Sequence, residues 1–206
     1  THGRRGLRRL LLGSVAAEVL HGSSCDVLTV PSCEEGPVER LGRRRSLAPL
    51  DLTDSSEPAL REAAAIAGFL EAPLTLLHVI EPAPLPVFSV GQGSSFGRLL
   101  PNIRHAARER LERLREETSL PAQTEMYVDE GPPALIIADF AEGQDIALIV
   151  MASRSRHGAQ RLLLGSVTER VVRRAPCPVW VLRAPVAEDP QGPLQRTAEK
   201  TDALAH

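Results

Sequence analysis

One ten-residue stretch occurs twice in this chain, and this repeat limits the fold more than any other feature. Residues 6–15 read Gly-Leu-Arg-Arg-Leu-Leu-Leu-Gly-Ser-Val, and residues 158–167 read Gly-Ala-Gln-Arg-Leu-Leu-Leu-Gly-Ser-Val, 152 positions later. The alignment continues without a gap from 6–30 against 158–182, and 11 of these 25 positions are identical. The identical residues are of six types in a fixed order, so low complexity does not explain them. The chain therefore contains two copies of one structural unit.

The offset between the copies measures the repeating unit, which is about 150 residues long with its linker. Only the second copy has enough chain before it for a whole domain. Because the chain starts at Thr1 and not at Met, we expect the first domain to be truncated. The expected organisation has four parts: residues 1–30 as the last helix and strand of a truncated first domain, 31–44 as a linker, 45–183 as a complete domain, and 184–206 as a disordered tail.

Composition excludes several classes of protein. Of the 206 residues, 43% are hydrophobic, enough for a packed core, and no apolar run reaches the roughly 18 residues that span a bilayer. A formal net charge of −2 argues against a nucleic-acid-binding protein. The odd set of Cys25, Cys33 and Cys177 favours neither a disulfide framework nor a metal site, and we expect Cys25 and Cys177 to be small buried residues. These features predict a soluble, cytoplasmic protein without a bound metal.

Short apolar runs alternate with helical patterns through residues 45–183. Strands are expected at 47–52, 74–80, 124–128, 145–151 and 179–182, and helices at 55–70, 103–114, 133–140 and 166–174. This order predicts an α/β domain with a five-stranded, parallel, doubly wound sheet of the Rossmann-like type and helices on both faces. In such sheets, ligands bind beyond the carboxyl ends of the strands, where the strand order reverses.

Two loops at that edge carry residues suited to a ligand. One follows the first strand at Pro49-Leu50-Asp51, and the other follows the fourth strand and leads to Gly165-Ser166 at the start of a helix. Free backbone N–H groups and hydroxyls at a helix start suit a phosphate. The alternative is that Ser166 caps its own helix, with Glu169 three residues on completing a capping box. His78, at the end of the second strand, is interpreted as a packed, hydrogen-bonded residue.

Several of these motifs together resemble the universal stress protein family. They are Pro-x-Asp after the first strand, His-Val-Ile ending the second, Glu-Gly-Pro-Pro before the third helix, and Leu-Leu-Leu-Gly-Ser-Val-Thr-Glu-Arg-Val followed by Ala-Pro-Cys-Pro-Val. The resemblance covers about residues 45–183 as one domain and 1–30 as the end of another, a tandem arrangement. It implies the adenine nucleotide alpha hydrolase-like variant of the Rossmann-like fold.

The resemblance also implies an ATP site, because nucleotide-binding members carry Gly-x-x-Gly, nine residues, then Gly-(Ser/Thr) around the phosphates. Carried over by position, the cofactor-binding residues would be Pro49, Leu50, Asp51, Val79, Met151, Ala152, Ser153, Arg154, Ser155, Gly165, Ser166, Val167 and Thr168. Two glycines of the motif are replaced here, by Ala152 and Ser155, which weakens the expected binding of ATP with Mg²⁺. The first copy keeps the later part of this pattern, with Gly3, nine residues, and Gly13-Ser14.

The function expected from these residues is an ATP-binding or nucleotide-sensing regulatory module in the stress response. The alternative is a module of the same fold that binds no nucleotide and serves dimerisation or interaction. In the family the last strands pair, which predicts a homodimer or an intramolecular pseudo-dimer through Val179, Trp180, Val181 and Leu182, with residues 27–30 as one partner strand. No Gly-Lys-(Ser/Thr), His-x-Gly-His or Ser-Gly-Gly-x-Asp-Ser motif is present, so we expect no dedicated enzyme, although slow ATP hydrolysis stays open.

Overall fold

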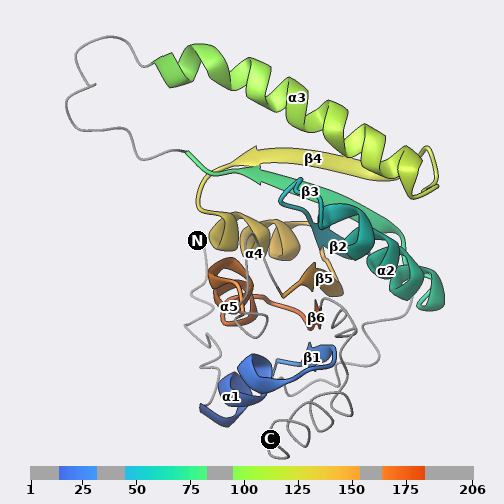
Figure 1. The fold of residues 1–206 in the computed structure, drawn as a ribbon, viewed down its shortest axis with the longest axis vertical. Helices are drawn as coiled ribbons and strands as arrows, with labels where there is room; N and C mark the ends of the chain where they lie inside the picture. The colour runs from blue at the N-terminus through green and yellow to red at the C-terminus, as the bar shows by residue number, and fades with distance from the viewer. Residues whose placement is uncertain (1–13, 32–44, 83–94, 154–163, 184–206) are drawn as a thin grey trace, which may run out of the picture.

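A computed structural model describes residues 14–31, 45–82, 95–153 and 164–183 of the chain. These segments form one six-stranded sheet with helices on both faces (Figure 1). The strands are β1 (Val27–Thr29), β2 (Ser46–Pro49), β3 (Leu74–Ile80), β4 (Glu125–Glu130), β5 (Leu148–Ala152) and β6 (Val179–Leu182). The helices are α1 (Ser14–Gly22), α2 (Ser56–Phe69), α3 (Ser95–Glu117), α4 (Pro133–Gly143) and α5 (Ser166–Val172).

The strand order is β1-β6-β5-β2-β3-β4, and the five strands of the second copy's domain run parallel. From β2 the chain moves outward through β3 to β4, and then returns to the other side of β2 to lay down β5 and β6. The strand order therefore reverses between β2 and β5. In open α/β sheets this reversal leaves a crevice at the carboxyl ends of the strands.

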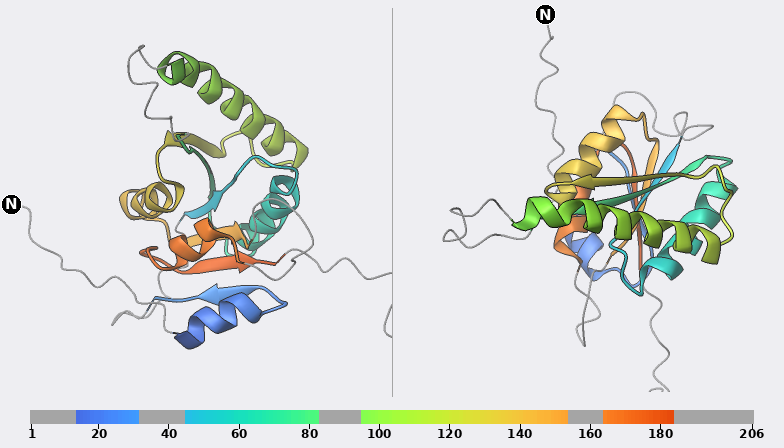
Figure 2. Two further views of the ribbon diagram at one scale, coloured as in Figure 1. Left: turned by 60° about the vertical axis from the view of Figure 1, so that its left-hand side comes forward. Right: turned by 90° about the horizontal axis from the view of Figure 1, so that it is seen from above.

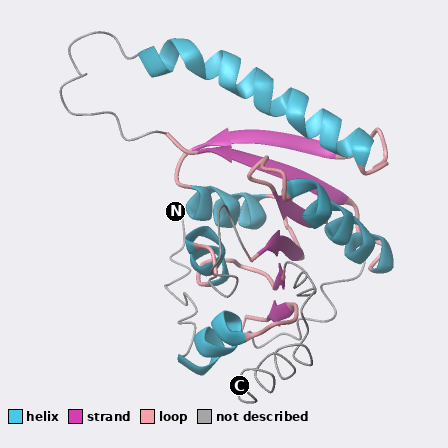
Figure 3. Ribbon diagram, in the orientation of Figure 1, coloured by secondary structure: helices cyan, strands magenta, loops and turns pink. Residues whose placement is uncertain are grey.

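Two hydrophobic clusters hold the helices to the sheet, because successive side chains along each strand point to opposite faces. Leu47, Leu77 and Ile149 belong to the cluster that includes residues of α4 and α5. Ala48, Leu76 and Leu148 belong to the cluster that includes residues of α2 and α3. Figure 3 shows the strands between α4 and α5 on one side and α2 on the other. The predicted α/β architecture with both faces covered is thus confirmed.

The sheet differs from the five-stranded prediction by one strand. Val27–Thr29 from the first copy pairs antiparallel with β6 and adds a sixth strand at the edge (Figure 2, left). The helix α1 accompanies it, and Leu20 on this helix is 0% exposed within the same cluster as α4 and α5. The added strand is free to run antiparallel because it comes from outside the βαβ units, whose crossover connections keep the other five strands parallel.

Several boundaries and one side chain also differ from expectation. β2 ends at Pro49, not at residue 52, since Leu52 has a φ of 60°, which a strand does not allow. Similarly, Asp145 has a φ of 49°, and β5 begins only at Leu148. Cys177 is buried as expected, whereas Cys25 is exposed, so the expectation of a buried Cys25 is wrong. Cys33 lies outside the described residues.

Among the helices that the structure describes, none combines the length and apolar character that a membrane crossing requires. The expected linker at 31–44 and the tail at 184–206 lie outside the described residues, apart from Pro31.

Candidate functional site

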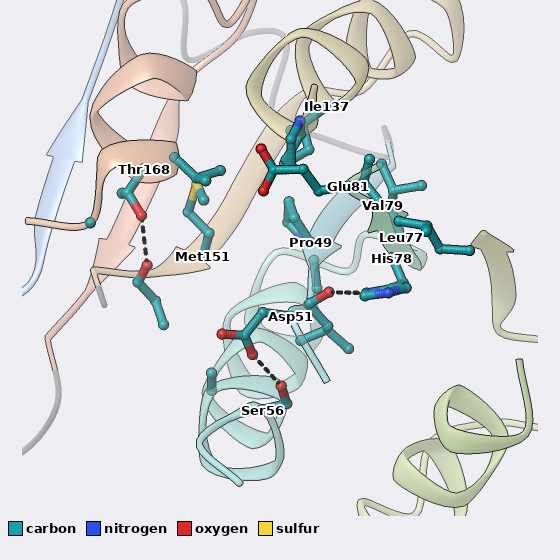
Figure 4. Close-up of a pocket in the computed structure, with 18 of the residues that line it drawn as sticks. Pro49, Asp51, Ser56, Leu77, His78, Val79, Glu81, Ile137, Met151 and Thr168 are labelled. Carbon is teal, nitrogen blue, oxygen red and sulfur yellow. Dashed lines mark hydrogen bonds between the residues drawn. The ribbon is translucent and has the colours of Figure 1, made fainter. Parts of the chain in front are cut away.

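A cavity of about 690 Å³ opens where the strand order reverses. This volume is within the range of small-molecule sites, roughly 300–1,000 Å³. Its walls come from the carboxyl ends of β2, β3 and β5, from the starts of α2, α4 and α5, and from α3. Figure 4 shows side chains from these elements facing a common space. The lining residues are Ala48, Pro49, Leu50, Asp51, Ser55, Ser56, Ala59, Leu77, His78, Val79, Ile80, Glu81, Pro82, Ile103, Pro133, Ile137, Val150, Met151, Ala152, Gly165, Ser166, Val167 and Thr168.

The loop after β2 holds Asp51 through one of its two carboxylate oxygens. Oδ1 of Asp51 accepts hydrogen bonds from the Thr53 amide at 3.1 Å, the Thr53 hydroxyl at 2.7 Å and the Ser56 hydroxyl at 2.9 Å. The bond from Ser56 ties the loop to the first turn of α2 (Figure 4). All three bonds end on Oδ1, and the exposed carboxylate keeps Oδ2 as an acceptor for a ligand.

His78 links the two strands beside Asp51. Its Nδ1 donates a hydrogen bond of 2.8 Å to the Leu50 carbonyl oxygen, so the neutral ring carries its proton on Nδ1 and leaves Nε2 as an acceptor. The ring is half-buried and contributes to the cavity wall (Figure 4). The interpretation of His78 as a packed, hydrogen-bonded residue is confirmed. The bond also fixes the backbone that carries Asp51, the next residue after Leu50.

Three hydrogen bonds hold the corner at which the end of β5 meets α5 and β6. The Gly165 amide donates to the Ser153 carbonyl at 2.7 Å, and the Thr168 hydroxyl donates to the Ala152 carbonyl at 3.0 Å. The Ser153 amide in turn donates to the Leu182 carbonyl at 2.7 Å. Thr168 is only 3% exposed, so its hydroxyl satisfies a carbonyl at the strand end. These bonds bring the start of α5 against the end of β5, at the cavity.

The capping interpretation of Ser166 is wrong. Gly165 is the N-cap residue of α5, with φ −63° and ψ 142°, and no side chain caps this helix end. Ser166 is the first helical residue and is exposed. Glu169 pairs with Arg173 at 2.8 Å, one turn further along the helix. A capping box requires its serine at the N-cap, one position earlier, so the geometry removes this alternative.

The described residues of the cavity wall carry a net negative charge. Among the lining residues that the structure describes, Asp51 and Glu81 are acidic, and there is no arginine or lysine. No group of three or more His, Cys, Asp or Glu side chains that could hold a metal ion occurs within the described ranges. A polyphosphate would therefore interact here with backbone N–H groups and hydroxyls, not with cationic side chains of the described wall.

Most of the residues predicted for the site line this cavity. They are Pro49, Leu50, Asp51, Val79, Met151, Ala152, Gly165, Ser166, Val167 and Thr168. Ser153 is 5% exposed and does not line it, because its backbone is turned to β6 and Gly165. The predictions for Arg154 and Ser155 lie outside the described residues.

The sequence interpretation missed other parts of the wall. Glu81 directly follows β3, and the rule that ligands lie beyond strand ends could have identified it. Ile103 on α3 and Ile137 on α4 come from helices whose apolar periodicity signals only burial. No local pattern distinguishes a helical isoleucine in a cavity wall from one in the core.

Comparison with known proteins identifies the family. The family model described as "Universal stress protein family" matches residues 1–31 and 42–183. The chain belongs to the universal stress protein family. Universal stress protein MJ0531 of Methanocaldococcus jannaschii is 34% identical over 148 residues, which are 70% of this chain and 85% of that protein.

Longer relatives match both parts of the chain. A universal stress protein of Mycolicibacterium smegmatis is 30% identical over 185 residues, 88% of this chain and 60% of that protein. The crystal structure of PA1789 from Pseudomonas aeruginosa has a TM-score of 0.65 at 20% identity, covering 97% of this chain and 66% of that one. This second likeness shows the fold alone. The chain thus spans about two thirds or less of these two relatives.

Proposed function

We propose that this universal stress protein is a regulatory module that binds an adenine nucleotide, ATP with Mg²⁺, in the cavity between β2 and β5. The observation that carries the proposal is the position of this cavity. It lies at the reversal of strand order, and its wall combines the Asp51 loop with the start of α5. Binding, and not a dedicated catalytic reaction, is the function we propose.

The wall offers each part of a nucleotide a chemically suitable surface. Val79, Ile137 and Met151 supply apolar surface for a base. Oδ2 of Asp51 is an acceptor suited to ribose hydroxyls. The Gly165 N-cap leaves backbone N–H groups of the first turn of α5 without helical partners, and Ser166 adds a hydroxyl, both suited to phosphate.

A second candidate function is an interaction module that binds no nucleotide. It is favoured by the negative charge of Asp51 and Glu81 in a described wall that has no arginine or lysine. The replacement of two motif glycines by Ala152 and Ser155 also favours a module that binds no nucleotide. In this case the pairing of β6 with another strand would be the functional feature.

Isothermal titration calorimetry with Mg-ATP separates the two functions. The variant Asp51→Asn keeps an oxygen for the bonds from Thr53 and Ser56 but replaces the second acceptor with an NH₂ donor. We expect binding by the unmodified protein and about tenfold weaker binding by Asp51→Asn, because losing one ribose hydrogen bond costs about 1.4 kcal/mol.

Asp139→Asn is the matched control, since Asp139 is exposed on α4 outside the cavity wall. It should bind Mg-ATP like the unmodified protein. No binding heat at millimolar Mg-ATP, or equal affinity of both Asp→Asn variants, would contradict the nucleotide proposal. Absence of heat would leave the interaction module as the supported function.

We also propose that β1 and β6 form an intramolecular pseudo-dimer, in which the first copy takes the place of a second molecule. The antiparallel pairing of these equivalent strands supports the proposal. A disulfide tests it: cysteines at positions 28 and 180, which lie opposite each other, should cross-link within one chain after Cys25 and Cys33 are replaced by serine. Only intermolecular cross-links would contradict it.

A further inference from the structure

The pairing of β1 with β6 is symmetric when the repeat is taken into account. Leu28 lies opposite Trp180, its own equivalent in the second copy at the offset of 152. Val27 lies opposite Val181, and Thr29 lies opposite Val179. Because Val27 is equivalent to Val179 and Thr29 to Val181, exchanging the two copies converts one pair into the other. A local two-fold axis therefore passes through the Leu28–Trp180 pair. The same backbone register would allow β6 to pair with β6 of a second chain.

The side chains at this junction are not symmetric. Oδ2 of Asp26 accepts a hydrogen bond from the Trp180 indole Nε1 at 3.1 Å, and Oδ1 accepts one from the Arg183 amide at 2.8 Å. The repeat equivalent of Asp26 is Pro178, whose side chain accepts no hydrogen bond. Both bonds therefore require the first copy's strand.

A third bond has the same asymmetry. The Thr29 hydroxyl donates to the Val179 carbonyl at 3.1 Å, and the repeat equivalent of Thr29 is Val181, which has no hydroxyl. In a pairing of β6 with a second β6, valine would stand in place of threonine on both sides. All three side-chain hydrogen bonds between Asp26 or Thr29 and the last strand would be lost.

From this asymmetry we infer that Asp26 is a specificity residue that makes the β6 edge select the first-copy strand β1 over β6 of a second molecule. The inference rests on the β1–β6 pseudo-dimer and deepens it. Backbone pairing stabilises either partner equally, whereas the carboxylate of Asp26 can bond only when the partner is β1. Two hydrogen bonds to a charged acceptor correspond to a preference of about tenfold or more for β1.

Arg183 strengthens this selection from the other side of the junction. Its guanidinium donates to the Leu20 carbonyl near the end of α1, so the residue that bonds Asp26 through its backbone also holds α1 through its side chain. Burial lowers the pKa of Arg183, and the nearby Asp26 carboxylate opposes that shift. Without the Asp26 charge, the half-buried guanidinium of Arg183 would lose a nearby negative charge that stabilises its cationic form.

One cysteine added at position 180, in a chain that keeps the buried Cys177, gives a direct test. In a symmetric β6–β6 pair, position 180 would face position 180 of the second chain, so Trp180→Cys cross-links two chains only in that arrangement. With Cys25 and Cys33 replaced by serine and Asp26 intact, we expect mostly monomer on a non-reducing gel. Trp180→Cys itself removes the bond from the indole, so Asp26→Ala removes the remaining bond from the Arg183 amide. Adding Asp26→Ala should therefore raise the yield of cross-linked dimer severalfold, because β1 then leaves the edge more often.

The control on the same background is Asp139→Ala, at an aspartate that is also exposed but lies on α4, and it should leave the dimer yield unchanged. Asp26→Asn keeps one acceptor oxygen, so its yield of cross-linked dimer should lie between the yields with aspartate and with alanine at position 26. Equal dimer yields for Asp26 and Asp26→Ala would overturn the selection by Asp26. Failure of the pseudo-dimer itself is distinguishable, since cysteines at 28 and 180 together would then form no intramolecular disulfide.

Discussion

Asp51 shows how much a single side chain at this site depends on its neighbours. Three hydrogen bonds from Thr53 and Ser56 converge on one of its oxygens, and Leu52 adopts a φ of 60° between them. A left-handed conformation costs a β-branched or bulky residue about 1–2 kcal/mol. Leu52 packs against the α2–α3 cluster, and this contact offsets the cost. The turn therefore holds Asp51 in place independently of any ligand.

Ala152 and Ser155 are the residues at which this chain departs from the phosphate-loop motif. Ala152 ends β5 and has no positive φ, so its backbone does not need glycine. We therefore expect Ala152→Gly alone to change the Kd for Mg-ATP less than twofold. The double variant Ala152→Gly with Ser155→Gly should bind about fivefold more tightly, because a glycine at 155 lets the loop backbone approach the phosphates.

Calorimetry on both variants and on Ser155→Gly alone checks this difference. The unfolding free energy should also fall by about 0.5–1 kcal/mol in Ala152→Gly, since glycine is unfavourable within a strand. A double variant that binds no more tightly than the unmodified protein would sink the idea that Ser155 weakens the site.

At the scale of elements, α2 is held to the sheet by a small number of buried side chains. Leu60 is 0% exposed and packs in the cluster formed by β2, β3, β5 and α3, whereas Leu135 on α4 is 37% exposed. Leu60→Ala should lower the unfolding free energy by about 3 kcal/mol, the usual cost of a cavity at a buried leucine. Urea denaturation measures this change.

Leu135→Ala is the matched comparison on another helix. It should lower the unfolding free energy by about 1 kcal/mol or less, because much of this side chain already contacts solvent. Similar losses for the two variants would show that α2 does not anchor the sheet as its burial indicates. Since α2 begins with Ser56, loosening it should also weaken the Asp51 turn.

The first-copy helix and strand leave exposed two side chains whose equivalents in the second copy are buried. Val19 is 54% exposed, whereas its repeat equivalent Val171 is 0% exposed. Val30 is 47% exposed, against 5% for its equivalent Leu182. The residues buried by α4 and β5 in one copy have no such cover among the described residues of the other. The repeat identifies the element, while its surroundings determine which side chains are buried.

At the scale of the whole molecule, Cys177 links stability to pH. The thiol is 7% exposed, and burial raises its pKa to about 12, opposed by a hydrogen bond from the Ile149 backbone. In the unfolded chain a cysteine ionises near pH 8.5. Below that pH both states hold the proton, and above it the unfolded state alone releases it. Folding stability is therefore lost as the pH rises from about 8.5 towards 12.

Urea denaturation at pH 7.5 and pH 10 tests this dependence. The stability of the unmodified protein relative to Cys177→Ala should fall by about 2 kcal/mol between these two pH values, because the alanine variant lacks the ionisation. Val172→Ala is the control, since this side chain is also 7% exposed but does not ionise, and its difference from the unmodified protein should stay constant. A constant difference for Cys177→Ala as well would contradict the expected linkage.

The sequence by itself determined the α/β fold, because alternating apolar runs and helix signals are local patterns that survive without tertiary contacts. It also placed the Asp51 loop and Gly165-Ser166 at one edge, since parallel strands bring their carboxyl ends together. It could not assign the N-cap of α5 or predict the contributions of Ile103 and Ile137 to the cavity, which depend on packing between helices distant in sequence.

The tertiary structure alone decided how the two copies meet. The repeat marked Asp26 and Pro178 as equivalent positions that differ, but nothing local shows that Asp26 bonds Trp180 and Arg183. Those partners are more than 150 residues away, and only strand pairing brings them together. Local periodicity specifies elements because neighbours in sequence share one backbone geometry. The selection of one edge partner over another depends on side-chain hydrogen bonds that exist only after the sheet has formed.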